Sequence, residues 1–125
     1  MNNSAIELFN ESKETLEKAK SYLNQNEFEE VITIIYEVTE KAINSLIIHK
    51  TKKIPKISLN LVELAEIANI PDEYNKLFKK MIGKDFTTSY ATYMYDQTES
   101  HKNEIREMIY DVDELLDYIE NELNE

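Results

Sequence analysis

Residues 36–46 read Tyr36-Glu37-Val38-Thr39-Glu40-Lys41-Ala42-Ile43-Asn44-Ser45-Leu46, within a longer run that has helical spacing. Apolar side chains recur every three or four residues from 28 to 46, with Thr39 among them, which is the period of one helix face. A second stripe adds Ile34, Val38 and Ile48, so this helix is apolar around most of its circumference. Such a helix is usually central in a bundle or is shared with a second subunit.

The rest of the chain supplies further helical patterns and few residues that break helices. Only one glycine and two prolines occur in 125 residues. We expect a first helix from Ser4, a short helix over 59–68 capped by Ser58, another from Pro71 to Gly83, and a last helix over about 96–122. Asn26 is the expected cap of the helix that runs to about His49. An apolar stripe marks the last helix: Ile105, Met108, Ile109, Val112, Leu115, Leu116, Ile119 and Leu123.

These patterns predict an all-α protein, an antiparallel four- or five-helix up-and-down bundle with short helices in the middle. Residues 1–125 are expected to form a single domain. Residues 84–97 are rich in Thr and Tyr, a β-like composition, but no second strand is present to pair with them. We therefore expect an irregular or partly helical junction there.

Composition limits the classes of function. The chain has no cysteine, no recognisable export signal and no apolar run long enough to span a bilayer, so we expect a cytoplasmic protein with no membrane partner. A net charge of −11 argues against a general nucleic-acid binder. The charge is uneven, however, because residues 49–98 carry +2 and residues 99–125 carry −8. The middle lysines form either solvated surface, which we favour, or a phosphate-binding patch: Lys50, Lys52, Lys53, Lys56, Lys76, Lys79, Lys80 and Lys84.

The sequence contains no motif for metal binding or for nucleophilic catalysis. Neither His49 nor His101 has a Glu three residues before it, as a di-metal helical bundle requires, so we expect no metal and no cofactor. The chain also lacks a Gly-x-Ser-x-Gly elbow and the glycines of a phosphate loop. No catalytic residue is predicted.

Two polar features remain as candidates. Glu37 and Lys41 lie four residues apart, which is ordinarily a helix-surface ion pair but could be a partly buried polar site in so apolar a helix. The tyrosines at 90, 93 and 95 could stack nucleic-acid bases, or they could be half-buried packing residues with wet hydroxyls.

Residues 36–46 resemble the second helix of the HEPN domain family, small helical bundles found beside minimal nucleotidyltransferases and among ribonuclease toxins. That helix typically reads Tyr-Glu-Ala-x-Glu-Lys-Ala-x-x-Ala-Leu. The matching positions here are Tyr36, Glu37, Glu40, Lys41, Ala42 and Leu46.

The family's catalytic signature is Arg, four to six residues, then His, often followed by x-Tyr, near the start of the last long helix. Aligning the final tyrosine with Tyr95 puts Thr88 at the Arg position and Tyr93 at the His position, and another register puts Ser89 at the Arg position. Thr carries no charge, and tyrosine, with a pKa near 10, is a poor base at neutral pH. The resemblance therefore implies a bundle without the ribonuclease pair.

We expect a non-catalytic HEPN-like binding or partner module. It could bind a nucleotide or single-stranded RNA, or pair with a minimal nucleotidyltransferase, as in toxin–antitoxin pairs. The alternatives are a metal-independent ribonuclease with an atypical site and a helical adaptor. A homodimer is expected because one small bundle cannot fully cover two apolar faces of one helix. The candidate ligand-binding residues are Glu37, Lys41, Lys84, Thr88, Tyr90, Tyr93 and Tyr95.

Overall fold

The computed structural model describes residues 3–82 and 99–125, and every element in them is helical. The helices are α1 (Asn3–Asn24), α2 (Phe28–Thr51), α3 (Leu61–Ile67), a 3-10 turn η1 (Asp72–Tyr74), α4 (Asn75–Ile82) and α6 (Glu99–Leu123). The described residues contain no strand. The predicted all-α class is confirmed.

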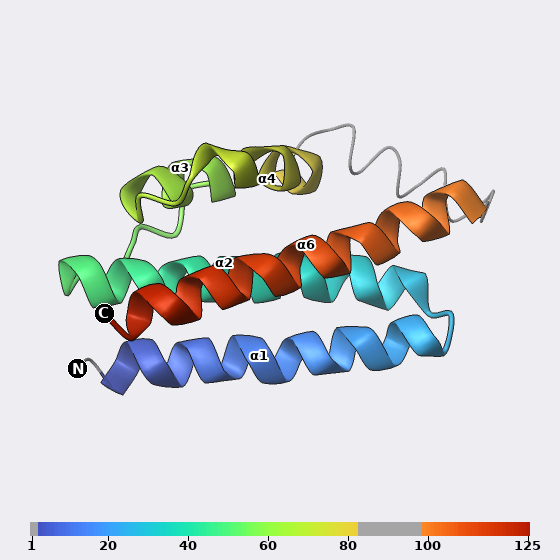
Figure 1. The fold of residues 1–125 in the computed structure, drawn as a ribbon, viewed down its shortest axis with the longest axis horizontal. Helices are drawn as coiled ribbons and strands as arrows, with labels where there is room; N and C mark the ends of the chain where they lie inside the picture. The colour runs from blue at the N-terminus through green and yellow to red at the C-terminus, as the bar shows by residue number, and fades with distance from the viewer. Residues whose placement is uncertain (1–2, 83–98) are drawn as a thin grey trace.

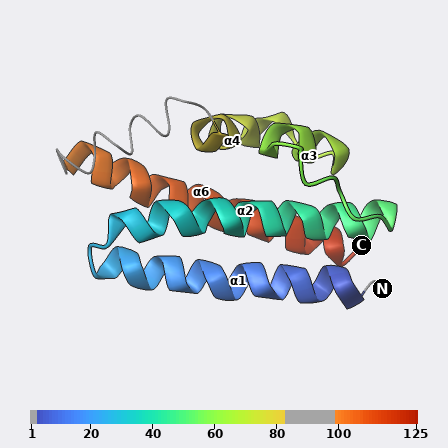
Figure 2. The same cartoon turned by 180° about the vertical axis from the view of Figure 1, so that it is seen from behind.

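The helices form an up-and-down bundle in which one leg is broken in two (Figure 1). Helices α1 and α2 make an antiparallel hairpin, α3 and α4 together run back along the bundle, and α6 returns parallel to α2. The reverse view shows α1 and the α3–α4 leg on opposite sides of α2 and α6 (Figure 2). Two long helices therefore lie in the middle of the bundle.

Helix α2 is central because its neighbours cover most of its surface. Val38, from its second apolar stripe, is fully buried, and Ile34 and Ile48 are partly buried against the core. Every residue of the predicted stripe in the last helix is also buried. Since this bundle already covers much of both faces of α2, the expected homodimer needs a contact surface elsewhere on the molecule.

Asn26 ends α1 rather than starting α2, so its predicted role as a cap is wrong. It takes a left-handed conformation with φ 61°. The amide of Asn26 donates to the carbonyl of Leu23 at 3.0 Å, and the amide of Glu27 donates to that of Tyr22 at 2.9 Å. This pair of bonds is a Schellman motif, in which asparagine tolerates the left-handed residue better than most side chains do. Helix α2 then begins without a side-chain cap.

The short helix α3 starts at a different cap from the predicted Ser58. The side chain of Asn60 accepts from the amide of Glu63 at 2.9 Å, and the Glu63 carboxylate accepts from the amide of Asn60 at 3.0 Å. This reciprocal capping box leaves Leu59 outside the helix. Helix α4 is preceded by the η1 turn after Pro71, and it buries Leu77, Phe78 and Met81.

Three buried hydroxyls lie within the apolar stripes, and each bonds to its own helix. Ser12 donates to the carbonyl of Phe9 at 2.6 Å, Thr39 to that of Ile35 at 2.8 Å, and Ser45 to that of Ala42 at 2.6 Å. All three side chains are fully buried. Because their hydrogen bonds are made locally, these polar groups interrupt the core pattern without an unmet polar atom.

Candidate functional site

The Glu37–Lys41 pair lies on the surface seam between α1 and α2. The Lys41 ammonium is 3.0 Å from the Glu37 carboxylate and 3.8 Å from that of Glu11. The side chains of Lys41 and Glu37 are 31% and 54% exposed. This is the geometry of a surface ion pair, which contributes only about 0–1 kcal/mol to stability. Because its side chain is partly exposed, Lys41 keeps the capacity to meet a ligand anion.

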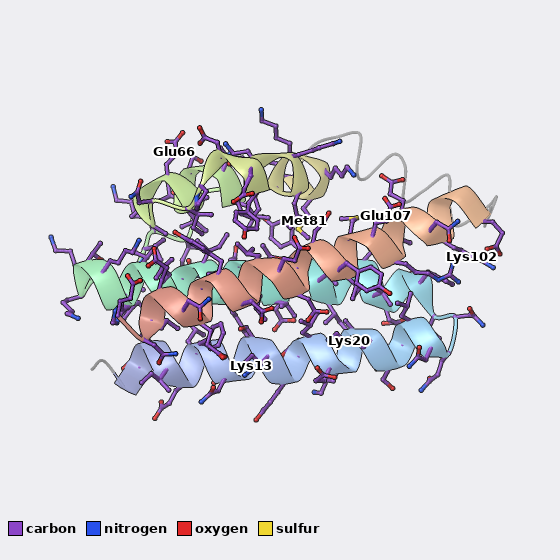
Figure 3. All side chains as sticks on the ribbon, viewed as in Figure 1. Lys13, Lys20, Glu66, Met81, Lys102 and Glu107 are labelled. Carbon is purple, nitrogen blue, oxygen red and sulfur yellow. The ribbon has the colours of Figure 1, made fainter. Side chains whose placement is uncertain are left out.

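The seam between α1 and α2 lies on the side of α1 that faces away from α6. The Lys13 ammonium pairs with Glu120 of α6, and the Lys20 ammonium pairs with Asp113 of α6. Both lysines therefore lie along a second seam, the one between α1 and α6 (Figure 3). Glu11 is two residues before Lys13, which places it roughly 200° away around the helix axis. It therefore reaches α2 and not α6.

The start of α6 packs over the start of α2. The Lys102 ammonium lies 5.6 Å and the Arg106 guanidinium carbon 5.7 Å from the centroid of the Phe28 ring. Glu37 follows Phe28 by nine residues, two and a half turns, so it faces roughly the opposite side of α2. Among the described residues, the first turns of α6 and the Glu37–Lys41 pair are thus not brought together.

Five of the seven predicted site residues lie outside the described residues: Lys84, Thr88, Tyr90, Tyr93 and Tyr95. The structure brings Glu37 and Lys41 together and leaves the other half of the predicted cleft as a prediction.

A groove between α1 and α6 contains residues that the sequence did not single out. Its volume is about 550 Å³, and it is lined by Lys20, Leu23, Asn24, Asn26, Arg106, Ile109, Tyr110 and Asp113. Pockets of roughly 300–1,000 Å³ hold small molecules and cofactors in proteins. The lining combines an apolar floor with two cations, two amides, one carboxylate and one phenol.

The Tyr110 ring is the exposed aromatic surface of this groove. Its side chain is 70% exposed, although tyrosine rings usually bury most of their area. Arg106 is one helical turn before it on α6 and is 39% exposed. Its guanidinium donates to the side chain of Asn103 at 2.8 Å and lies 3.8 Å from the Glu99 carboxylate. A flat cation and an open ring therefore lie on one face of α6.

Lys20 is the second cation of the groove, and its charge is secured by its neighbours. Its ammonium is 3.0 Å from Asp113 and 3.4 Å from Glu17. Partial burial lowers the pKa of Lys20, but the hydrogen bond and the charge of Asp113, helped by Glu17, outweigh burial and raise the pKa above its ordinary value. Lys20 is consequently protonated at neutral pH.

Metal binding has no visible site in the described part of the chain. Residues 3–82 and 99–125 hold no group of three or more His, Cys, Asp or Glu side chains placed to bind an ion. Within the same ranges, no helix combines the length and the apolarity that crossing a bilayer requires.

The sequence did not indicate the α1–α6 groove, because the residues that line it are far apart along the chain. Arg106 and Tyr110 are four residues apart, so helical periodicity alone could have placed them on one face. Nothing in the sequence indicated that this face lies beside Lys20 and the α1–α2 turn. Tertiary packing alone brings them together.

Comparison with known proteins gives one match. No curated protein and no solved structure matches the chain. The family model of the HEPN domain matches residues 5–122, a range that includes all the described helices except the first two residues of α1 and the last of α6. The helical bundle and the family model agree, and the chain belongs to the HEPN domain family.

Proposed function

We propose that this HEPN domain is a non-catalytic module that binds a nucleotide or a short single strand of RNA in the groove between α1 and α6. The observation that carries the proposal is the exposed ring of Tyr110 beside Arg106 and Lys20, in a chain of net charge −11. A base would stack on Tyr110 while Arg106 meets a phosphate. The amides of Asn24 and Asn26, at the edge of the groove, are suited to hydrogen bonding with base edges.

The sequence supports binding without cleavage. Arg106 is the only arginine of the chain, and it comes after both histidines, so no Arg precedes a His by four to six residues. Phosphodiester cleavage in the family depends on that pair for charge stabilisation and proton transfer. Here Thr88 or Ser89 and Tyr93 take those positions.

The predicted ligand residues before α6 fit the same proposal. Lys84, Thr88, Tyr90, Tyr93 and Tyr95 precede α6 directly in sequence. In the proposal Lys84 would bind a further phosphate of the strand, and Tyr90 or Tyr93 would stack a further base. The Glu37–Lys41 pair would instead belong to a separate contact on the α1–α2 seam.

Partners form the second part of the proposal. We infer that the chain works as a homodimer and that a minimal nucleotidyltransferase is its protein partner, since HEPN domains occur beside such enzymes. Tyr95 matches the tyrosine of the family motif, which such partners modify in some toxin pairs.

A titration at low salt tests the binding site. Fluorescently labelled oligoadenylate and ATP would be added to the wild type, to an Arg106→Ala, Tyr110→Ala variant and to a Lys41→Ala, Tyr93→Ala variant. The first variant is expected to lose roughly tenfold or more in affinity, because stacking and a phosphate contact are both removed. Affinity should also fall steeply with added salt.

Lys13→Ala is the matched control, because Lys13 also pairs with α6 at 3.0 Å but does not line the groove. Its affinity should equal that of the wild type. If only the Lys41→Ala, Tyr93→Ala variant loses binding, the ligand site is the one predicted from the sequence. If the wild type binds neither probe, the adaptor function replaces this proposal.

A further inference from the structure

The connector between α2 and α3 exposes two isoleucines completely or nearly so. Ile57 is 100% exposed and Ile54 is 85% exposed, against 45% for Ile67 on α3. The connector is anchored at both ends. Lys52 closes α2 in a left-handed conformation, and Asn60 caps α3. The isoleucines thus project from a segment whose ends are tied to the bundle, and an exposed apolar pair of this kind indicates a contact surface.

The same connector is basic in an acidic protein. No Asp or Glu occurs from residue 41 to residue 62, although the chain has 25 acidic residues. The ammonium of Lys50 is turned back to the carbonyl of Ala68, at 2.7 Å, and that of Lys52 to the carbonyl of His49, at 2.8 Å. Within the described residues, Lys53 and Lys56 make no ion pair. Their charges flank the two isoleucines and are open to a partner.

An acidic groove, opposite in charge to the connector, lies between α4 and α6 and has a volume of about 290 Å³. Glu107, Asp111 and Glu114 form a row along α6 on its rim, and Leu77 and Tyr74 supply apolar surface. None of these three carboxylates takes part in an ion pair among residues 3–82 and 99–125. Lys76 and Lys80 also line the groove, but with Glu73 the carboxylates outnumber them. Figure 3 shows Glu107 on the side of α6 that faces α4.

We propose that the connector of one copy docks into the α4–α6 groove of a second copy. Ile57 would lie on Leu77 and Tyr74, while Lys53 and Lys56 face the carboxylates of α6. A second copy is the occupant that the charges favour. Two chains of charge −11 repel each other over most of their surface, so a contact between the basic connector and a row of carboxylates favours association.

In this proposal the pair is closed, and the connector of each copy occupies the groove of the other. This proposal rests on the homodimer part of the proposed function, and it is independent of the α1–α6 groove. It also supplies the contact surface that α2 does not offer.

Sedimentation velocity over a range of protein and salt concentrations tests the docking. The wild type is expected at twice 14.7 kDa at micromolar concentration, with dissociation as salt rises. A connector variant, Ile57→Asp with Lys53→Glu and Lys56→Glu, should dimerise at least about tenfold more weakly. A groove variant, Glu107→Lys, Asp111→Lys and Glu114→Lys, should do the same. Circular dichroism checks that each variant folds, which exposed positions favour.

Matched controls are Ile67→Asp and Lys18→Glu, an exposed isoleucine and an exposed lysine outside both surfaces. Both should dimerise as the wild type does. The decisive variant carries both charge reversals in one chain. Lys53 and Lys56 are changed to Glu, and the three α6 carboxylates are changed to Lys. Its connector is acidic and its groove basic, so dimerisation should return.

Each other outcome overturns the docking. A dimer that the connector variant leaves unchanged keeps the homodimer but places its interface elsewhere. If the wild type is monomeric at every concentration, both the docking and the homodimer are wrong. A monomer that co-sediments with phosphatidylserine vesicles, and loses this with Ile57→Asp, would assign the connector to an anionic lipid surface instead.

Discussion

The ammonium of Lys50, near the end of α2, donates a hydrogen bond of 2.7 Å to the backbone carbonyl of Ala68, which follows α3. It also lies 3.7 Å from the Glu122 carboxylate of α6. One cation near the end of α2 therefore contacts the C-terminal ends of α3 and α6, where unpaired carbonyls leave partial negative charge. The contact fixes the short α3–α4 leg to the two central helices.

Replacing Lys50 with Met should lower the free energy of unfolding by about 1–2 kcal/mol. The variant keeps the apolar stem and removes a charged hydrogen-bond donor, and the 30% exposure of the side chain limits the loss. Urea denaturation followed by circular dichroism measures the change. Lys18→Met, at an exposed site on α1, should stay within about 0.5 kcal/mol of the wild type. Equal losses in the two variants would contradict the role of Lys50.

Tyr118 should make the protein sensitive to alkali. Burial, then the 2.8 Å hydrogen bond it donates to Glu122, raise its pKa from 10.0 to about 12. The Tyr74 ring, whose centroid is 5.8 Å from that of the Tyr118 ring, adds to the burial of Tyr118. Because the neutral phenol is favoured in the folded state, this stabilisation is complete below pH 10 and is lost as pH rises through about 12.

The Tyr118→Phe variant tests this, because phenylalanine keeps the ring and cannot ionise. The melting temperature of the wild type should fall more steeply than that of the variant between pH 10 and pH 12. The variant should also be somewhat less stable at neutral pH, since its hydrogen bond to Glu122 is gone. Parallel curves for the two proteins above pH 10 would show that another group titrates.

Two neighbouring polar residues should differ sharply in their effect on stability. Asn60→Ala removes the side chain that caps α3 and should cost about 0.5–2 kcal/mol. Ser58→Ala, two residues earlier in the connector, removes a hydroxyl that caps nothing and should be nearly neutral. Thermal unfolding of the two variants side by side gives the comparison. A larger loss for Ser58→Ala would mean that α3 starts where the sequence pattern first indicated.

Purified protein should leave total RNA intact, with or without divalent metal. The reason is the absence of an Arg–His pair at the spacing that cleavage in this family requires. Gel electrophoresis of RNA after prolonged incubation measures the outcome. Cleavage that disappears in a Tyr93→Phe or Lys41→Ala variant would establish an atypical ribonuclease site, whereas cleavage that persists in both would indicate a contaminant.

The long amphipathic helices were predictable because their burial follows a regular period. The stripe from Ile105 to Leu123 is buried throughout, as the pattern in the sequence indicated. Helix ends were less predictable. Asn26 and Asn60 both have the side chain of a cap, but one takes the left-handed position after α1 and the other starts α3. Local sequence does not distinguish these uses, because the choice depends on where the neighbouring helix must begin.

The candidate site shows the same limit on a larger scale. The Glu37–Lys41 pair was visible because its partners are one turn apart. The α1–α6 groove joins Lys20 with Arg106 and Tyr110, and only the packing of the first helix against the last makes them neighbours. A charged residue on the flank of a stripe indicates an edge of the core, but not which helix lies across that edge.

The central place of α2 has a consequence for how the chain is made. The α1–α2 hairpin is contiguous in sequence, so it can close as soon as residue 51 has left the ribosome. Helices α3, α4 and α6, which cover α2 on its other sides, are synthesised only after the hairpin. Until then the nascent hairpin presents a bare apolar face. That interval is when a chaperone, or a neighbouring nascent chain, has access to a surface that the finished molecule conceals.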